Sequence, residues 1–280
     1  MLSRILSTLV IWGVILGGLY FFGAHAAVAM VTLLAALTLS EFYGLTEKMG
    51  ARPFRWLGIL FSVLITAGPY AVAFFIGEGD GSENLVTALL VLALLVSCLR
   101  VLGERDSTNR IETIAVTVIG LLYIPFMLQF LVRLLLRDSD SGDNLTICLW
   151  VVAVAKFCDI GALLAGLAFG RHKLAPNISP KKTWEGAVGG VLVSAGVGAT
   201  IAYFVPDHLP ESLTPVVAAV IAVPLAVVAI ISDLIESAVK RRADTKDTGA
   251  LIPGIGGAFD LTDSLILTAP VAYFIFLFLE

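Results

Sequence analysis

The sequence has few charged residues for its length, and it lacks any long polar segment. Only 14% of its 280 residues are charged, whereas 58% are hydrophobic and the mean hydropathy is +0.96. Soluble domains carry about 25% charged residues. The longest polar segments have about 15–25 residues, too few to bury a core of their own. The composition therefore argues against a soluble domain and predicts an all-α, polytopic integral membrane protein.

Cysteine is also scarce. Cys98, Cys148 and Cys158 lie in or at the ends of apolar runs, without the spacing of a metal site. An odd set of membrane-embedded cysteines provides no disulfide framework, so we expect these side chains to pack as small apolar groups.

Hydropathy predicts about nine membrane spans in one membrane domain over residues 1–280. The predicted spans are residues 5–23, 25–40, 54–76, 85–103, 111–136, 146–169, 184–205, 213–239 and 262–279. A cleaved signal peptide is the alternative for the first run, but that run exceeds a typical signal core and a second follows at once. Residues 1–140 hold the less informative N-terminal spans, and residues 141–280 the spans expected to be catalytic.

The basic residues predict the orientation. With this topology, all of the 18 Lys and Arg residues except Arg133, Arg137 and Lys156 lie in loops or at span ends on one side. Such loops are typically cytoplasmic. We therefore expect a cytoplasmic N-terminus, an inner or plasma membrane location, and a cytoplasmic loop between the last two spans.

The most polar stretch of the chain, residues 232–264, surrounds that loop. One helical face carries Asp233, Glu236, Ser237 and Lys240, and the last span begins with Asp260, Asp263 and Ser264. Between these faces lie Arg241, Arg242, Lys246, Asp247, Gly254, Gly256 and Gly257. Carboxylates hold hard cations, bases hold phosphate, and glycine amides approach phosphate closely. The stretch therefore predicts phosphoryl or nucleotidyl transfer on a metal–polyphosphate substrate.

Asp233 and Asp260 are the first choices as metal ligands, because each lies on a helix that points at the same loop. Carboxylates at span ends need cations or buried partners. The alternative is an i,i+4 pair of Glu236 with Lys240 that only stabilises a helix end.

Two upstream features could contribute to the same site. Lys181 and Lys182 precede Thr183, a candidate N-cap, and this pattern is typical of a phosphate site. The alternative is a basic anchor at the membrane surface. Lys156 and Asp159 lie three residues apart inside the sixth span. They form either a salt bridge that fixes packing or a functional pair in which Asp159 faces a polar cavity.

The long pattern over residues 237–264 resembles the signature of the phosphatidate cytidylyltransferases, or CDP-diacylglycerol synthases. It reads Ser237-x2-Lys240-Arg241-x4-Lys246-Asp247-x-Gly249-x2-Ile252-Pro253-Gly254-x-Gly256-Gly257-x2-Asp260-x2-Asp263-Ser264. The segment Ser179-Pro180-Lys181-Lys182-Thr183-Trp184-Glu185-Gly186 and the tripeptide Glu41-Phe42-Tyr43 are similar to that family too. Two positions depart from its pattern: Ile255 stands where the family usually has His, and Leu261 where it usually has Arg.

The resemblance implies transfer of CMP from CTP to phosphatidic acid at a membrane surface, with Mg²⁺ as cofactor and room for a second, monovalent cation. It implies that Asp247 and Asp263 join Asp233 and Asp260 around the metal, and that Lys240, Arg241 and Lys246 bind phosphate. The expected substrate-binding residues are Asp159, Ser179, Lys181, Lys182, Thr183, Glu185, Glu236, Ser237, Gly254, Gly256, Gly257 and Ser264. Membrane lipids are expected partners, a nucleic acid is not, and a homodimer is compatible with the sequence.

Two other functions fit parts of the pattern. A CTP-dependent polyprenol or phytol kinase would use a similar site but would leave CDP. An ion-coupled transporter would use the Lys156/Asp159 pair, although the charges cluster at one membrane face instead of lining a path through it.

Overall fold

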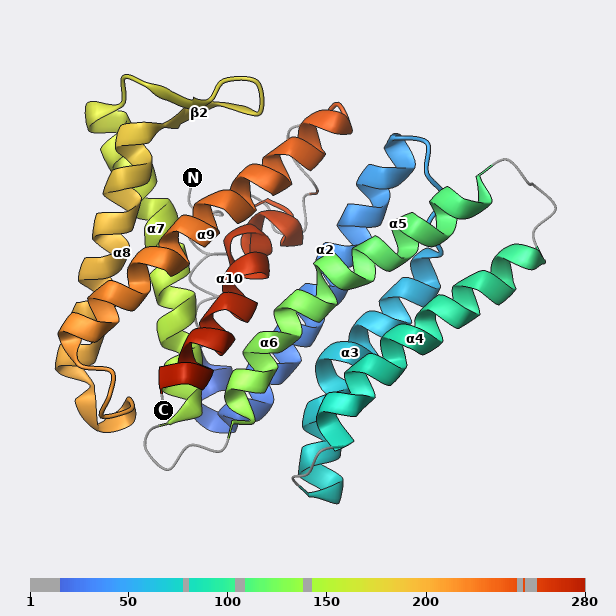
Figure 1. Cartoon of the computed structure of the whole chain (residues 1–280), viewed down its shortest axis with the longest axis horizontal. Coiled ribbons are helices and arrows are strands. Elements are labelled where there is room, and N and C mark those ends of the chain that lie inside the picture. The colour runs from blue at the N-terminus through green and yellow to red at the C-terminus, as the bar shows by residue number, and fades with distance from the viewer. Residues whose placement is uncertain are drawn as a thin grey trace. The chain divides into compact units, whose positions relative to one another are not determined.

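The computed structural model describes residues 16–77, 81–103, 109–137, 143–245, 249 and 256–279, and these are helical except for short connections and one β-hairpin (Figure 1). The helices are α2 (Ala24–Lys48), α3 (Arg55–Ile76), α4 (Gly81–Leu102), α5 (Arg110–Tyr123), α6 (Pro125–Leu135), α7 (Asn144–Phe169), α8 (Trp184–Phe204), α9 (Pro215–Arg242) and α10 (Ala258–Leu279), with a 3₁₀ turn η1 (Pro206–His208). Residues 16–22, before α2, are also helical.

Eight helical segments in the described part of the chain are long and apolar enough to cross a membrane, with α5 and α6 forming one of them. They correspond to the second to ninth predicted spans, so the all-α polytopic fold is confirmed. Most of the first predicted span lies outside the described residues.

The main difference from the predicted spans is at helix ends. The last helix begins at Ala258 and the one before it ends at Arg242, so both extend beyond the apolar runs that hydropathy detects. The polar residues of both ends are therefore helical rather than in the loop, and helical spacing decides which of them share a face.

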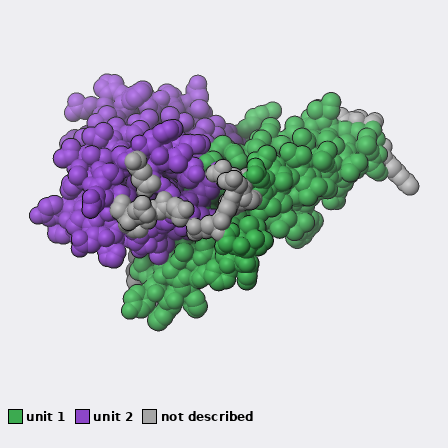
Figure 2. Space-filling view, turned by 60° about the horizontal axis from the view of Figure 1, so that its bottom comes forward, with its two compact units in different colours: residues 1–132, 242–262 green, residues 133–241, 263–280 purple. Residues whose placement is uncertain are grey.

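The chain divides into two compact units, residues 1–132 with 242–262 and residues 133–241 with 263–280 (Figure 2). In the first unit, α2, α3 and α5 pack around the fully buried Tyr43. Its hydroxyl donates to the Thr117 carbonyl at 2.8 Å. A Cβ on Gly120 would lie 2.5 Å from the Tyr43 ring, so this glycine allows α5 to approach α2.

In the second unit, α7 and α8 lie side by side in close contact (Figure 1). A Cβ on Gly161 would lie 2.6 Å from Val193 Cβ, and one on Gly190 would lie 2.8 Å from the Cys158 carbonyl oxygen. Small residues let membrane helices approach in this way. Cys148 and Cys158 are free and buried, as the expected packing role requires.

A β-hairpin joins α7 to α8. Strand β1 (Lys173–Ala175) pairs antiparallel with β2 (Ser179–Thr183). The Thr183 hydroxyl then accepts a hydrogen bond from the Gly186 amide at 3.1 Å, which confirms Thr183 as the N-cap of α8. The hairpin thus delivers Lys181 and Lys182 to the start of a long helix.

The glycines of α8 provide a test of this packing. Gly190→Ala should lower the thermal midpoint of the detergent-solubilised protein by several degrees, because its methyl group meets backbone of α7. Overpacking of this kind costs roughly 1–3 kcal/mol.

Gly196→Ala is the matched control. It lies on the same helix with nothing within 4 Å of its Cβ position, so it should leave the midpoint unchanged or slightly raised. Equal effects of the two substitutions would contradict the packing described here.

Candidate active site

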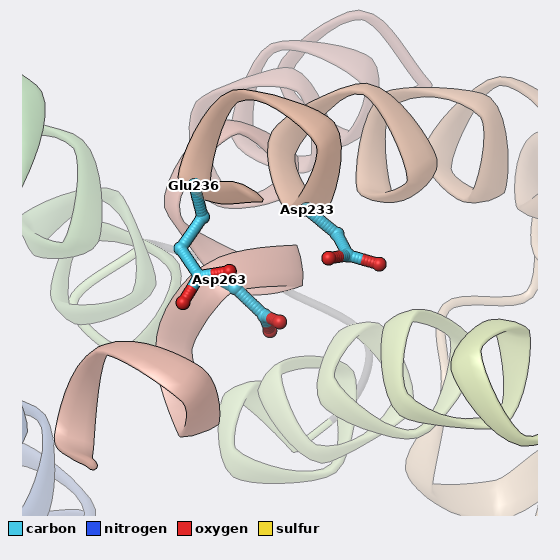
Figure 3. A group of neighbouring side chains, drawn as sticks. All are labelled: Asp233, Glu236 and Asp263. Atoms are coloured by element: carbon cyan, nitrogen blue, oxygen red, sulfur yellow. The ribbon is translucent and has the colours of Figure 1, made fainter. Parts of the chain in front are cut away.

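Three carboxylates from two helices come together in the second unit. Asp233 and Glu236 lie one helical turn apart on α9, and Asp263 is on α10. One oxygen of each lies within 4.8 Å of the others (Figure 3). Glu236 is buried, and the other two are half-buried. Oxygen ligands in such a group are those that hard divalent cations prefer.

Each carboxylate of this group is paired with a lysine from a different part of the unit. Lys240 Nζ lies 2.7 Å from Glu236, so the predicted i,i+4 pair exists. Lys156 Nζ of α7 lies 3.2 Å from Asp263, and Lys182 of the hairpin forms an ion pair with Asp233. The lysines reduce the repulsion among carboxylates that are withdrawn from water.

Lys156 also connects the group to Asp159 and Ser264. Its Nζ lies 3.6 Å from the Asp159 carboxylate and donates to the Ser264 hydroxyl at 2.8 Å. These ion pairs join three lysines to four carboxylates in one network.

Backbone contacts hold Asp263 in place. The Ser264 amide donates to the Asp263 carboxylate at 2.6 Å. The Ser232 hydroxyl of α9 donates to the Asp263 carbonyl oxygen. Ser232 therefore fixes α10 against α9 at the level of the acidic group, and it is not among the residues predicted from the sequence.

A cavity of about 400 Å³ lies beside this group in the second unit. Its polar lining comes from α7, the hairpin and α9: Asp159, Lys181, Lys182, Thr183 and Asp233. Its apolar lining comes mainly from α7 and β1: Leu163, Leu167 and Leu174. Asp159 thus pairs with Lys156 and also lines the cavity, and no residue of the ninth predicted span is among the lining residues.

Other predicted residues support the hairpin instead of lining the cavity. The Glu185 carboxylate accepts hydrogen bonds from the amides of Arg171 and His172 and lies 2.6 Å from His172 Nδ1. Arg241 Nε donates to the Ile178 carbonyl at 3.2 Å. The structure therefore places Glu185 and Arg241 where they hold the hairpin that carries the lysines. Ser179 begins β2, and Ser237 follows Glu236 on α9.

The remaining predicted residues divide between the first unit and the undescribed part. In the first unit, the Asp260 carboxylate accepts from the Gly257 amide at 2.8 Å. Gly256 has φ +114°, a left-handed conformation that favours glycine. Lys246, Asp247, Gly254 and Ile255 lie outside the described residues.

Lys156 belongs to the acidic group's surroundings, although it is not among the site residues predicted from the sequence. Lys156 contacts Asp159, which lies one helical turn away on α7. It also contacts Asp263 and Ser264 of α10, which lie 107 and 108 residues later in the sequence. The available signal was a lone lysine within an apolar span, since such a residue usually has a buried partner.

The chain is therefore a polytopic helical membrane protein whose candidate site consists of acidic residues paired with lysines beside a cavity. A family model described as the cytidylyltransferase family matches residues 2–279. The chain therefore belongs to the cytidylyltransferase family and is a nucleotidyltransferase, as the signature predicted.

Named relatives are similar to the chain over most of its length. The phosphatidate cytidylyltransferase of Rickettsia bellii is 39% identical over 188 residues, 66% of this chain and 78% of the relative. That of Synechocystis is 30% identical over 283 residues, 93% of this chain and 89% of the relative. The chloroplastic phosphatidate cytidylyltransferase 5 of Arabidopsis thaliana is 31% identical over 286 residues, 93% of this chain and 68% of the relative.

The lysine pairing predicts a metal-dependent change in stability. Lys156→Met removes the partner of Asp159 and Asp263, so it should lower the thermal midpoint in EDTA by a few degrees. Losing a hydrogen bond to a charged group costs about 2 kcal/mol. Millimolar Mg²⁺ should recover more of the midpoint in this variant than in the wild type.

A second variant separates charge from packing. Lys156→Met combined with Asp159→Asn removes one positive and one negative charge and keeps all three carboxylates of the acidic group, so it should be less sensitive to EDTA than Lys156→Met alone. A single variant that responds to Mg²⁺ no more than the wild type would contradict the charge argument.

Proposed function

We propose that the chain transfers the cytidylyl group of CTP to the phosphate of phosphatidate, giving CDP-diacylglycerol and pyrophosphate. Family membership supports nucleotidyl transfer, and the names of the relatives support phosphatidate as acceptor. The observation that carries the proposal is the group Asp233, Glu236 and Asp263, which lies beside a cavity lined by Lys181 and Lys182.

In this reaction a phosphate oxygen of the lipid attacks the α-phosphorus of CTP. One P–O bond forms, the bond between the α-phosphorus and its bridging oxygen breaks, and pyrophosphate leaves with the electron pair. The lipid phosphate is already anionic, so a strong general base is unnecessary. The protein's contribution is then orientation of two anionic substrates and neutralisation of their charge.

The acidic group suits a divalent cation. Asp233, Glu236 and Asp263 offer oxygen ligands from α9 and α10, and one oxygen of each lies within 4.8 Å of the others. The cation, with Mg²⁺ as the proposed ion, would neutralise the polyphosphate when bound. Asp260 and Asp247 remain proposed as further ligands, and a second, monovalent cation as an addition.

The lysines would exchange partners when substrate binds. Lys182 pairs with Asp233, and both line the cavity. A bound triphosphate would attract Lys182, which frees the Asp233 carboxylate for the cation. Lys181 and the N-terminus of α8 at Thr183 would add positive potential to the same phosphates. Lys240, Arg241 and Lys246 are proposed to assist on the loop side.

The apolar lining of the cavity supports a lipid acceptor. Leu163 and Leu167 of α7 line it and are themselves largely exposed on the helix surface, where a membrane lipid would meet them. A lipid phosphate could then reach the polar residues while its acyl chains stay among apolar ones. We further propose that this end of the protein faces the cytoplasm, where CTP is available, as the distribution of Lys and Arg indicates. A homodimer, which is compatible with the sequence, stays a prediction.

A double-label assay distinguishes this reaction from a lipid kinase. Full-length protein in detergent, with phosphatidate and Mg²⁺, should move label from α-³²P-CTP into lipid and label from γ-³²P-CTP into pyrophosphate. A CTP-dependent kinase acting on a polyprenol would instead transfer the γ label to lipid. Transfer of the γ label, or of neither label by folded protein, would contradict the proposal.

The acidic group gives the second test. Asp233→Asn should lower CDP-diacylglycerol formation by about 10²–10³-fold, because the site loses a charge that stabilises the bound cation. Asp207→Asn is the control, since Asp207 is exposed in η1. Both variants should insert into the membrane normally. Wild-type activity of Asp233→Asn would remove Asp233 from the site.

A further inference from the structure

The backbone N–H groups at the start of α10 find only part of their hydrogen-bond acceptors within α10 itself. The first backbone N–H groups of any α-helix have no partner within that helix. Asp260 supplies one acceptor, since its carboxylate accepts from the Gly257 amide at 2.8 Å. The next two donors are the amides of Ala258 and Phe259, which are both fully buried residues. Buried amides need partners, and these two find theirs elsewhere in the unit.

Glu41 of α2 accepts from both. Its Oε1 accepts from the Ala258 amide and its Oε2 from the Phe259 amide, each at 2.9 Å. Glu41 is the first acidic residue of the sequence and stands within a membrane-spanning helix. A carboxylate there is costly unless it is paired, and two amides at the positive end of a helix dipole are suitable partners.

Neighbouring contacts extend this attachment along both helices of the first unit. Thr38, one turn before Glu41, places its hydroxyl oxygen 3.0 Å from that of Thr262. The Phe42 ring packs edge-on against Phe259, with centroids 6.2 Å apart. α2 therefore holds the first turn of α10 by polar and apolar contacts together.

Gly249 marks the space that the Glu41 carboxylate occupies. A Cβ at this position would lie 2.7 Å from Glu41 Oε1. Gly249 belongs to the signature between Lys240 and Ser264, whereas Glu41 lies some 200 residues earlier in the sequence. The close approach gives a physical reason for glycine here that does not involve a ligand.

We propose that Glu41 is a positioning residue for cytidylyl transfer. From α2 it caps α10 and so sets the orientation of the capped turn, to which Asp260 belongs. Asp263 follows three residues later on the same helix. The Glu41 carboxylate acts through α10, because both of its oxygens are engaged by backbone amides. This inference rests on the function proposed above.

Glu41→Gln tests it in the full-length protein. The amide side chain has one acceptor oxygen, so one of the two backbone bonds is lost. Removing a residue that orients a metal ligand typically costs 10–100-fold in metal affinity or activity. We expect a loss of that size in kcat or in apparent Mg²⁺ affinity, with little change in the KM for CTP. Glu41→Asp keeps both acceptor oxygens and should recover part of the loss.

Two further variants make the comparison specific. Gly249→Ala should shift the Mg²⁺ dependence in the same direction, because its methyl group displaces the Glu41 carboxylate. Glu47→Gln is the matched control on α2, since Glu47 is exposed and pairs only loosely with Arg55 at 3.7 Å. It should leave kcat and the Mg²⁺ dependence unchanged.

Hydrogen exchange of the peptide containing residues 257–260 provides a readout that does not need activity. It should be faster in Glu41→Gln than in Glu47→Gln. If Glu41→Gln does not fold, Glu41→Asp and Gly249→Ala carry the same test. Faster exchange together with wild-type kcat and Mg²⁺ dependence would show that Glu41 stabilises the start of α10 without positioning the site, which contradicts the proposal. Unchanged exchange would show that Glu41 does not cap α10.

A wild-type protein that makes no CDP-diacylglycerol would instead count against the proposed function. Glu41 is then tested by the rise in thermal midpoint that Mg²⁺ causes. A smaller rise in Glu41→Gln than in Glu47→Gln supports the positioning role, and equal rises contradict it.

Discussion

Charge neutralisation inside membrane-spanning helices is the constraint on which the site depends. Asp233, Glu236 and Asp263 are withdrawn from water, and each has a lysine partner. A carboxylate in this environment is tolerated only with such partners, so the lysines are part of the fold as well as of the site. Under the proposed function, a bound cation or polyphosphate would replace one of these charge partners.

Close helix packing brings those partners within reach. Glycines at the contact between α7 and α8 let the helices approach, and the hairpin between them returns Lys182 to the Asp233 carboxylate. Glu185 and Arg241 hold the base and the tip of that hairpin. Residues that look like substrate ligands in the sequence thus include some whose contacts are to the protein backbone. They contribute by placing the lysines.

The N-termini of α8 and α10 are both capped by side chains, but the capping residues come from different distances in the sequence. Thr183 caps α8 with its own hydroxyl, whereas α10 receives its cap from Asp260 and from Glu41 of another helix. A local cap can be read from neighbouring residues, since it follows a short spacing rule. A cap from a residue some 200 positions away cannot be read in this way, because nothing in the sequence near α10 indicates which helix will lie beside its N-terminus.

The sequence by itself determined the membrane fold, the second to ninth spans and the family, because long apolar runs and a long spaced signature are local patterns. The sequence also indicated that Asp233, Glu236 and Asp263 lie on the polar faces of two helices. Only the tertiary structure decided that these three form one group, that Lys156 and Lys182 neutralise it, and that Glu41 caps α10. Helical periodicity states which residues share a face, but packing between distant helices decides which faces meet.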